Sequence, residues 1–464
     1  MKNVKLENKD GMDLLTLIRT KQLKASEVKE HFVGVIKEKN FELNAVVHPM
    51  FNAGINKGPF EGLPFLIKDL NAVKGEPLSS GSKLMDGYIA EIDDINVRRF
   101  KQAGLTIIGK TNTPEFGFTP ATESGYLGAA RNPWNVDFSP GGSSGGAAAA
   151  VASGMIPFAH ANDGGGSIRI PASCCGVFGL KPTRGRTPLA MNFNSFSVNH
   201  AVTRSVRDSA ALLDLLKGPQ KTDSFSTPID KESFLEEVGN EPGILKIGYM
   251  SDFGSLMEID PEVQKVTEAT AKLCESLGHQ VEIAYPDFDL HSFMDAFVTV
   301  WVVGGALAVK EAARLNQKEL KESNMERLLF TLLEKGSNIT ALEYEEARQV
   351  LHTESVKIHK FFDSYDVLLH PVNSKPPLPL GHYSGEEKSV EEILAVSAEY
   401  AHLTPIANVT GQPAMSVPLY WGEHNLPMGS HFMGRFGDEA TLFRLASQLE
   451  KAQPWWSKYE QLND

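Results

Sequence analysis

The sequence predicts an α/β fold with a large mixed, mostly parallel β-sheet that is covered on both faces by helices. One observation is a strand–helix–strand order: a buried strand over 63–67 (LPFLI), a helix over 95–103 and a strand over 105–108. This order favours parallel pairing of the two strands, with the helix packed on the sheet. No repeat with a period of about 20 to 50 residues is visible, which argues against solenoids and propellers.

The same order returns in the second half of the chain. Asp260 and Pro261 have the residue types of a helix N-cap and first turn, apolar residues follow at helical spacing, and Gly278 ends the helix. A strand is expected next, over 281–284. Cys274 lies beside the apolar face of this helix, so we expect it to be a small core residue and not a thiol nucleophile.

Composition and charge exclude several classes of protein. The chain has 464 residues, with 45 Lys and Arg against 58 Asp and Glu, and a formal net charge of −13. An acidic chain is poorly suited to bind nucleic acid directly or to bind an anionic membrane surface. The longest apolar run, over 296–309, has 14 residues, whereas a membrane-spanning helix needs about 20. Three cysteines cannot form a disulfide framework and no signal-peptide pattern is present, so we expect a cytoplasmic protein.

Glycine is concentrated in one part of the chain. Between 141 and 185 lie 11 of the 40 glycines, and most of them belong to two serine-containing loops, SPGGSSGG over 139–146 and NDGGGSIR over 162–169. Each loop runs into a segment with helical character. Because glycine lacks a Cβ atom, a ligand can approach the backbone amides of such loops closely. These two loops are therefore the candidate site.

One way to activate a serine here is the nucleophile elbow of α/β-hydrolases. Gly141, Ser143 and Gly145 match its G-x-S-x-G pattern, but the preceding segment RNPWNVDFSP has no sustained apolar run that predicts a buried strand. The elbow also needs a histidine base. The candidates are His160, His200, His370 and His431. None has a recognisable setting for a base, so the elbow is the weaker interpretation.

The other way is a lysine base whose pKa is lowered by burial and neighbouring positive potential. Lys68 follows the predicted strand over 63–67, and Lys110 follows the predicted strand over 105–108. Their positions relative to these strands are similar. Spacing alone therefore does not choose between them.

Four separated blocks together resemble the amidase signature family. They are GLPFLIKD (62–69), RNPWNVDFSPGGSSGG (131–146), NDGGGSIRIPASCCGVFGLKPT (162–183) and NVTGQPAMSVPL (408–419). The third block and the C-terminal PMGSHFMGRFGDEATLFRLASQLE are similar to stand-alone bacterial amidases, including the cyclic-dimer hydrolase branch. The resemblance implies one domain over 1–464. Its parts are an N-terminal helical segment (about 1–58), a signature core (about 59–216), a variable substrate-side region (about 217–365) and a C-terminal part that completes the core (about 366–464).

The resemblance also implies a Ser-Ser-Lys catalytic triad, which maps onto Lys68, Ser143 and Ser167. It selects Lys68 over Lys110 and makes Ser167, not Ser143, the nucleophile. Lys68, neutral in a buried site, accepts a proton from Ser167 through the Ser143 hydroxyl, and an acyl-enzyme forms on Ser167. In this family the peptide bond before the first serine of the GGSSGG block, here Gly142–Ser143, is cis.

The loop around Ser167 is expected to supply the oxyanion hole. The implied donors are the backbone N–H groups of Gly164, Gly165 and Gly166, with that of Ser167. Several relatives carry an apolar residue or Thr at position 164, so the unbroken glycine triplet is a departure from the family pattern. Asp163 and Arg169 flank the nucleophile and are expected to hold the loop by ion pairs or hydrogen bonds. Cys174 and Cys175 are expected to be buried structural thiols in the helix that follows.

The predicted function is hydrolysis of a small-molecule amide, linear or cyclic, to an acid and ammonia or an amine. No metal or cofactor is expected, because no HExxH motif or clustered Cys/His set is present. Two alternatives are a glutaminase subunit of a tRNA-dependent amidotransferase and, with low weight, an esterase that uses Ser143; a catalytically silent scaffold is a third. The stretch over 293–309 suits either an apolar wall beside the substrate or a core helix. The sequence leaves the physiological amide, the need for a partner subunit and the oligomeric state, monomer or homodimer, open.

Overall fold

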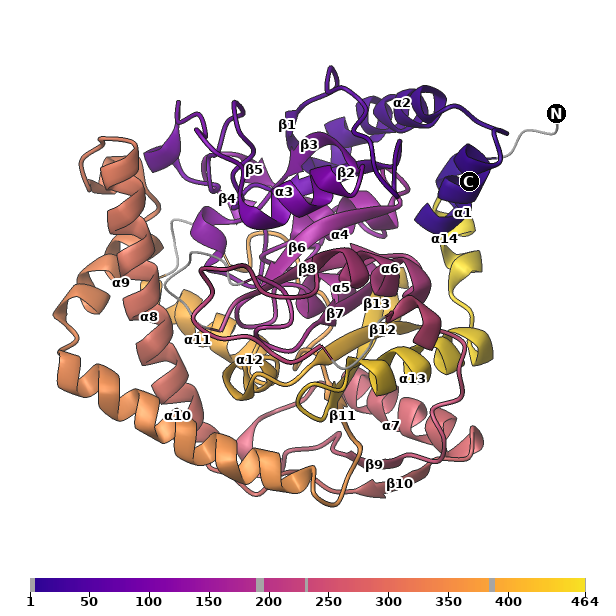
Figure 1. Cartoon of the computed structure of the whole chain (residues 1–464). Coiled ribbons are helices and arrows are strands. Elements are labelled where there is room, and N and C mark those ends of the chain that lie inside the picture. The colour runs from indigo at the N-terminus through magenta and orange to yellow at the C-terminus, as the bar shows by residue number, and fades with distance from the viewer. Residues whose placement is uncertain (1–4, 189–195, 230–232, 384–388, 464) are drawn as a thin grey trace.

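The computed structural model describes residues 5–188, 196–229, 233–383 and 389–463. Eleven strands form one sheet in the order β1-β3-β2-β6-β8-β7-β12-β13-β11-β9-β10 (Figure 1). In that order the strands are Val46–Pro49, Thr106–Thr111, Pro64–Lys68, Phe158–Asp163, Val198–Thr203, Phe178–Lys181, Ala414–Trp421, Pro427–Gly434, Val367–Pro371, Lys246–Tyr249 and Gln280–Ile283. A separate two-stranded ribbon consists of β4 (Glu123–Ser124) and β5 (Gly128–Ala129). Strands from both halves of the chain therefore share one sheet.

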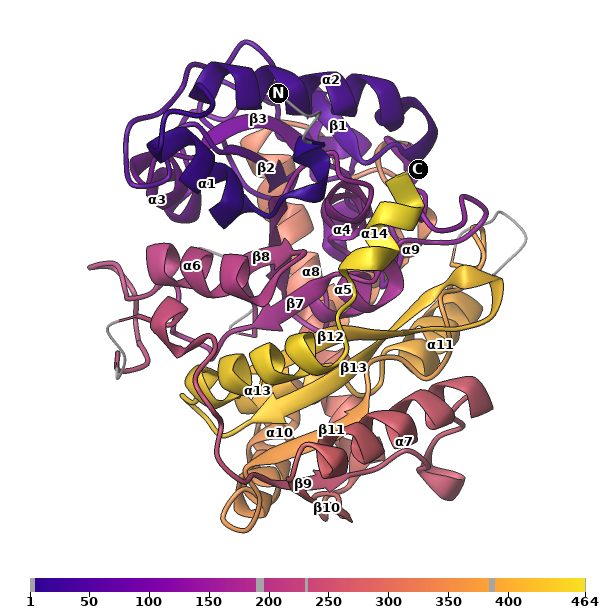
Figure 2. The same ribbon diagram turned by 90° about the vertical axis from the view of Figure 1, so that its right-hand side faces the viewer.

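Helices lie on both faces of the sheet, as the sequence predicts. Figure 2 shows α6, α7 and α13 on the near side of the strands, with α8 and α10 on the far side. The helices α1 to α7 are Gly11–Arg19, Ala25–Leu43, Ile95–Gln102, Gly145–Ala152, Arg169–Cys175, Val206–Leu216 and Pro261–Ser276. The helices α8 to α14 are Leu290–Leu315, Arg327–Asn338, Ala341–Phe361, Val390–Tyr400, Pro405–Thr410, Glu439–Ala452 and Trp456–Asn463.

The sheet is mixed, but the prediction that it is mostly parallel is wrong. Of the ten neighbouring strand pairs, four are parallel and six are antiparallel. The parallel pairs lie toward the two ends of the sheet, where the strand–helix–strand units β2-α3-β3 and β9-α7-β10 occur. The centre is built from β6, β8, β7, β12 and β13, which pair antiparallel. Of these, β12 and β13 form a hairpin closed by residues 422–426, a connection that requires antiparallel pairing.

The unit β2-α3-β3 positions the first candidate base. β2 is buried along its whole length, and Phe65 packs its ring against Phe100 of α3 at a centroid distance of 4.5 Å and against Phe158 of β6 at 5.7 Å. The parallel register places Lys68 beside Thr111. Burial of these aromatic rings holds β2 in the centre of this half of the sheet, so its last residue is enclosed by protein.

The predicted elements of the second half are also confirmed. Asp260 accepts a hydrogen bond from the Glu262 amide and Pro261 begins α7, while β10 pairs parallel with β9. Cys274 is fully buried in the main core, as expected for a structural thiol. The polar stretch 217–242 contains, in its described part, only the short 3-10 helix Leu235–Glu237.

Helix α8 packs against both α9 and α10 at one side of the molecule (Figure 1). By length and composition α8 is apolar enough to cross a membrane, yet half of its most apolar window is buried within the protein. Its N-terminal half contributes Phe293 and Phe297 to a core cluster. The apolar stretch over 293–309 is therefore a packed helix, and its inner face also borders the pocket described below.

Candidate active site

Lys68 is a buried lysine with two hydrogen-bond partners. Its Nζ atom lies 2.7 Å from Ser143 Oγ and 2.7 Å from Asn162 Oδ1. The side chain is completely buried, and this loss of hydration lowers the pKa of Lys68 well below its ordinary value, while the charge of Asp163 acts in the opposite direction. Lys68 is therefore suited to be a neutral amine and to accept a proton.

Lys110, the other lysine that the sequence leaves as a candidate, occupies a different environment. Its Nζ forms a buried ion pair with Asp69 Oδ1 at 2.5 Å and donates to the Pro77 carbonyl at 2.7 Å. Burial lowers its pKa, whereas Asp69 raises it. The structure thus places Lys68 at the serines and Lys110 in an ion pair on the neighbouring strand.

The two serines of the glycine-rich loops meet although 24 residues separate them. Ser143 Oγ lies 3.0 Å from Ser167 Oγ, so a continuous hydrogen-bonded path runs from Lys68 through Ser143 to Ser167. The Gly142–Ser143 peptide bond is cis, as the family resemblance implies. Ser143 is buried, whereas Ser167 is partly exposed and borders a pocket. Of the three residues, Ser167 is the one that a substrate can reach.

The setting of Ser143 does not match a nucleophile elbow. The residues just before it form no strand in the described chain. The four histidines considered as its base are all buried, and none has a hydrogen bond to Ser143 within the described residues. His160, the one nearest Lys68 in the network, accepts from the Lys68 amide at 3.4 Å, and burial lowers its pKa to about 3. His160 therefore contacts the backbone of Lys68, whereas the Lys68 amine is the group that contacts Ser143.

Asp163 and Arg169 hold the loop that carries Ser167, as expected. They form a fully buried ion pair with Arg169 Nη2 2.9 Å from Asp163 Oδ1 and Nε 3.0 Å from Oδ2. Burial acts to raise the pKa of Asp163, but the charge of Arg169 and the hydrogen bonds lower it below its ordinary value. The same carboxylate accepts from the amides of Gly166 at 2.7 Å and Ile168 at 3.1 Å.

The Gly166 amide is therefore not directed at a substrate. Its hydrogen is engaged by Asp163, and the neighbouring Gly165 carbonyl accepts from Thr404 Oγ1 at 2.7 Å. The Gly165–Gly166 peptide unit is thus fixed at both ends. By contrast, the amides of Gly164, Gly165 and Ser167 have no hydrogen-bond partner among the described residues. Gly166 is one of the three glycines predicted as oxyanion donors. Because its amide donates to Asp163, we do not count it among the candidate donors.

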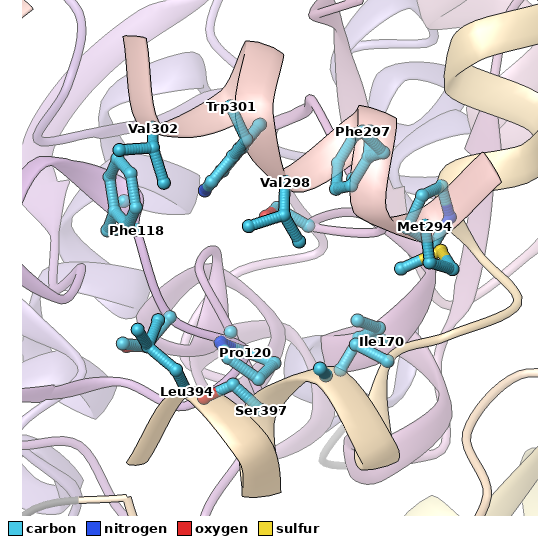
Figure 3. A pocket seen from close by; sticks show the side chains of 18 of the residues that line it. Phe118, Pro120, Ile170, Met294, Phe297, Val298, Trp301, Val302, Leu394 and Ser397 are labelled. Carbon is cyan, nitrogen blue, oxygen red and sulfur yellow. The ribbon is translucent and has the colours of Figure 1, made fainter. Parts of the chain in front are cut away.

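An apolar pocket opens in front of Ser167 (Figure 3). Met294, Phe297, Val298, Trp301 and Val302 of α8 form one wall, opposite Pro120, Ile170, Leu394 and Ser397. Trp301 stacks on Phe297 and packs against Phe118, with ring centroids 5.5 Å and 5.4 Å apart. No residue of this described lining carries an ionisable acidic or basic side chain.

The glycine triplet lies against this aromatic wall. A Cβ atom at Gly164 would come within 3.1 Å of the Trp301 ring, and one at Gly165 within 3.3 Å of the Phe297 ring. The departure from the family pattern at Gly164 therefore coincides with a large indole that fills the adjoining space. The sequence signal for this wall was the apolar run in α8, but its contact with Gly164 was not predicted.

The cysteines and possible metal ligands do not add to the site. Cys174 and Cys175 are buried near the end of α5 and burial raises the pKa of both thiols, to about 12 for Cys174, so they are structural as expected. No group of three or more His, Cys, Asp or Glu side chains arranged to hold a metal occurs among the residues that the structure describes.

Comparisons with known proteins agree with this fold. The Amidase family model matches residues 21–443. The chain is 34% identical to the 6-aminohexanoate-cyclic-dimer hydrolase of Paenarthrobacter ureafaciens, over 96% of this chain and 95% of that protein. A solved structure of 6-aminohexanoate cyclic dimer hydrolase superposes with a TM-score of 0.93 at 32% identity, covering 99% of each chain. A bacterial aryl acylamidase of the amidase signature family gives 0.88 at 25% identity, covering 98% of each chain.

The fold and site define a hydrolase that acts on amides. The chain belongs to the amidase signature family.

Proposed function

We propose that the protein hydrolyses carboxylic amides with Ser167 as nucleophile, Ser143 as proton relay and Lys68 as base. The observation that carries this proposal is the hydrogen-bonded path from Lys68 Nζ to Ser143 Oγ at 2.7 Å and on to Ser167 Oγ at 3.0 Å. A serine hydroxyl is a weak nucleophile unless a base removes its proton as it attacks. The buried amine of Lys68 is the base to which this path leads.

In the first step the Ser167 oxygen bonds to the amide carbon and the carbonyl π electrons move to its oxygen. The Ser167 proton passes to Ser143 Oγ while the Ser143 proton passes to Lys68 Nζ. When the tetrahedral intermediate collapses, the C–N bond breaks and Ser143 gives its proton to the departing nitrogen, taking one back from Lys68. Water then attacks the Ser167 ester by the same proton path, which releases the acid.

The developing negative charge on the carbonyl oxygen needs hydrogen-bond donors that are already in place. We assign this role to the amides of Gly164, Gly165 and Ser167, which have no partner among the described residues. The peptide fixed between Thr404 and Asp163 keeps the loop in the shape that presents them. Since the Gly166 amide contributes to that fixation, its role is structural.

The pocket favours a substrate whose bound part is apolar and uncharged. Aromatic and aliphatic side chains make up most of its described lining, which contains no acidic or basic group to pair with a charge, and burying an unpaired charge is costly. Free glutamine carries both an ammonium and a carboxylate, so a glutaminase role is not favoured. Neutral aliphatic, aryl and cyclic amides are suitable substrates, and the relatives named as a cyclic-dimer hydrolase and an aryl acylamidase support including both types.

The experiment is a screen of the purified chain, without added subunits, against aliphatic, aryl, peptide C-terminal and cyclic amides, with release of amine or ammonia as the readout. Ser167→Ala is expected to abolish hydrolysis while the circular dichroism spectrum stays unchanged, and Lys68→Ala nearly to abolish it. Mass spectrometry of a quenched turnover should find the acyl group on the peptide that contains Ser167. An acyl group on Ser143, with Ser167→Ala still active, would instead support the elbow mechanism.

A further inference from the structure

Lys68 has a second partner that the triad does not explain. We propose that Asn162 is a positioning residue whose side-chain oxygen accepts one hydrogen of the Lys68 amine and so directs the nitrogen lone pair at Ser143. This inference rests on the proposed role of Lys68 as the base. Asn162 lies near the end of β6, next to Asp163, and the distance from its Oδ1 to Lys68 Nζ is 2.7 Å.

A chain of hydrogen bonds fixes which end of the Asn162 amide faces Lys68. The Asp94 carboxylate only accepts, so Asn71 must turn its Nδ2 toward it, at 2.9 Å. Asn71 Oδ1 then faces Asn162 Nδ2, at a longer distance of 3.5 Å. This leaves Asn162 Oδ1 toward Lys68. Both asparagines are buried, so solvent does not compete for these groups.

The orientation follows from the valence of a neutral amine. Such an amine has two N–H bonds and one lone pair, whereas an amide oxygen carries no hydrogen and only accepts. One N–H bond must therefore point at Asn162. Because rotation about the Cε–Nζ bond is then restricted, the lone pair can be held toward the hydroxyl group of Ser143, whose Oγ lies 2.7 Å from Nζ.

Asn162 also acts on the product of the proton transfer. The proton leaves Ser143 Oγ and forms a third N–H bond at Nζ, while Ser143 receives the proton of Ser167. Lys68 is then a buried ammonium with no carboxylate within ion-pair distance among the described residues. The negative end of the Asn162 amide dipole stabilises this cation, so removal of Asn162 should make Lys68 a weaker base.

The other charged and titratable groups described around Lys68 are paired with other residues or are neutral. On β6, Asp163 is paired with Arg169, and His160 is neutral because burial lowers its pKa to about 3. Asp69, the residue after Lys68, is paired with Lys110. Asp94 lies behind Asn71, and burial raises its pKa. Among the residues that the structure describes, no ionisable group is in direct contact with Lys68 Nζ, so a change at position 162 acts on Lys68 alone.

The test is the pH profile of kcat/KM for an amide that the wild-type protein hydrolyses. In the wild type, activity should rise with pH as Lys68 loses its proton. For Asn162→Ala we expect kcat to fall by about tenfold or more, KM to change by less than about threefold, and the rising limb to move to lower pH by about half a unit. Asn162→Asp places a carboxylate opposite the amine, so its limb should move to higher pH by at least about one unit.

Asn199→Ala is the matched control, because Asn199 lies directly opposite Asn162 on β8 and its side chain bonds to His160 instead of Lys68. For Asn199→Ala, the rising limb of the pH profile of kcat/KM should stay at the wild-type pH even if the protein is less stable. If Asn162→Ala does not fold, Asn162→Ser is used with the same direction expected. The positioning role would be overturned if Asn162→Ala and Asn162→Asp both lost activity while the rising limb of their pH profiles stayed at the wild-type pH. Full activity of Lys68→Ala would instead overturn the proposed function itself.

Discussion

Gly166→Ala tests whether the fixed peptide in the nucleophile loop is essential. Gly166 has a φ of +136°, a conformation that residues with a Cβ atom rarely adopt. A Cβ atom placed there would lie 2.3 Å from Thr404 Oγ1 and 2.6 Å from Ile170 Cδ1. Thr404 must then move, and its hydrogen bond to the Gly165 carbonyl is lost.

The expected loss of stability follows from these two effects. A residue held in a disfavoured backbone region costs about 1–3 kcal/mol, and a lost neutral hydrogen bond costs about 0.5–1.5 kcal/mol. Together they give roughly 1.5–4.5 kcal/mol, measured as the change in the free energy of unfolding in urea. Because the freed loop no longer presents the Gly164, Gly165 and Ser167 amides, kcat should also fall by about 100-fold, the effect of losing an oxyanion donor.

Gly165→Ala is the matched control one residue away. Gly165 does not have a positive φ, and its Cβ would point at Phe297 with a closest distance of 3.3 Å. We expect a smaller loss of stability than for Gly166→Ala, because only the Phe297 ring must shift slightly, and a loss of activity confined to bulky substrates, since the new methyl group enters the pocket. If Gly166→Ala is as stable and as active as Gly165→Ala, the fixed Gly165–Gly166 peptide does not hold the loop that carries Ser167, and this reasoning is refuted.

Three further outcomes are expected. Trp301→Leu should widen the pocket beside Gly164, so the ratio of kcat/KM for a bulky aryl amide over a small aliphatic amide should rise at least about threefold in steady-state assays. Burial, and then the carboxylate of Glu326, raises the pKa of Glu115 to about 8. A carboxyl whose pKa is higher in the folded than in the unfolded state loses its stabilising effect as pH rises, here between about 4.5 and 8. Glu115→Gln should therefore flatten the fall in urea stability over this range, and an unchanged slope would contradict the assigned cause. EDTA should leave the rate unchanged because the proposed base is Lys68 and not a metal-bound water; a loss that Zn²⁺ restores would count against the mechanism.

The strand–helix–strand units were predictable because their signals are local. A buried strand, an amphipathic helix and the residues that cap it are all visible within about 50 residues, as in 63–108. The orientation of the central strands was not predictable in this way. It depends on which distant segments pair, and β6 pairs with β8 and β7 with β12 across long connections whose direction no short pattern specifies.

Part of the candidate site was predictable for a similar reason. The glycine-rich loops were recognisable by composition. Lys68 and Lys110, however, lie at the C-terminal ends of the adjacent strands β2 and β3 and differ in their tertiary partners. Asn162 and Thr404 had no signal beyond being polar residues near a loop or helix start. The family resemblance assigned Gly166 to the oxyanion hole. The direction of each amide within a glycine run cannot be inferred from residue type, and the hydrogen bond to Asp163 that turns the Gly166 amide away forms only in the folded chain.

The placement of charge explains how a lysine can serve as a base in this interior. Two carboxylates, Asp69 and Asp163, belong to the segments that contain Lys68 and Asn162, and either one in contact with Nζ would hold the lysine as an ammonium. Each is instead paired with another buried cation, Asp69 with Lys110 and Asp163 with Arg169. The second pair also holds the nucleophile loop through the Gly166 amide. Removing Arg169 should therefore damage two properties together, because the freed Asp163 would both release the loop and raise the pKa of Lys68.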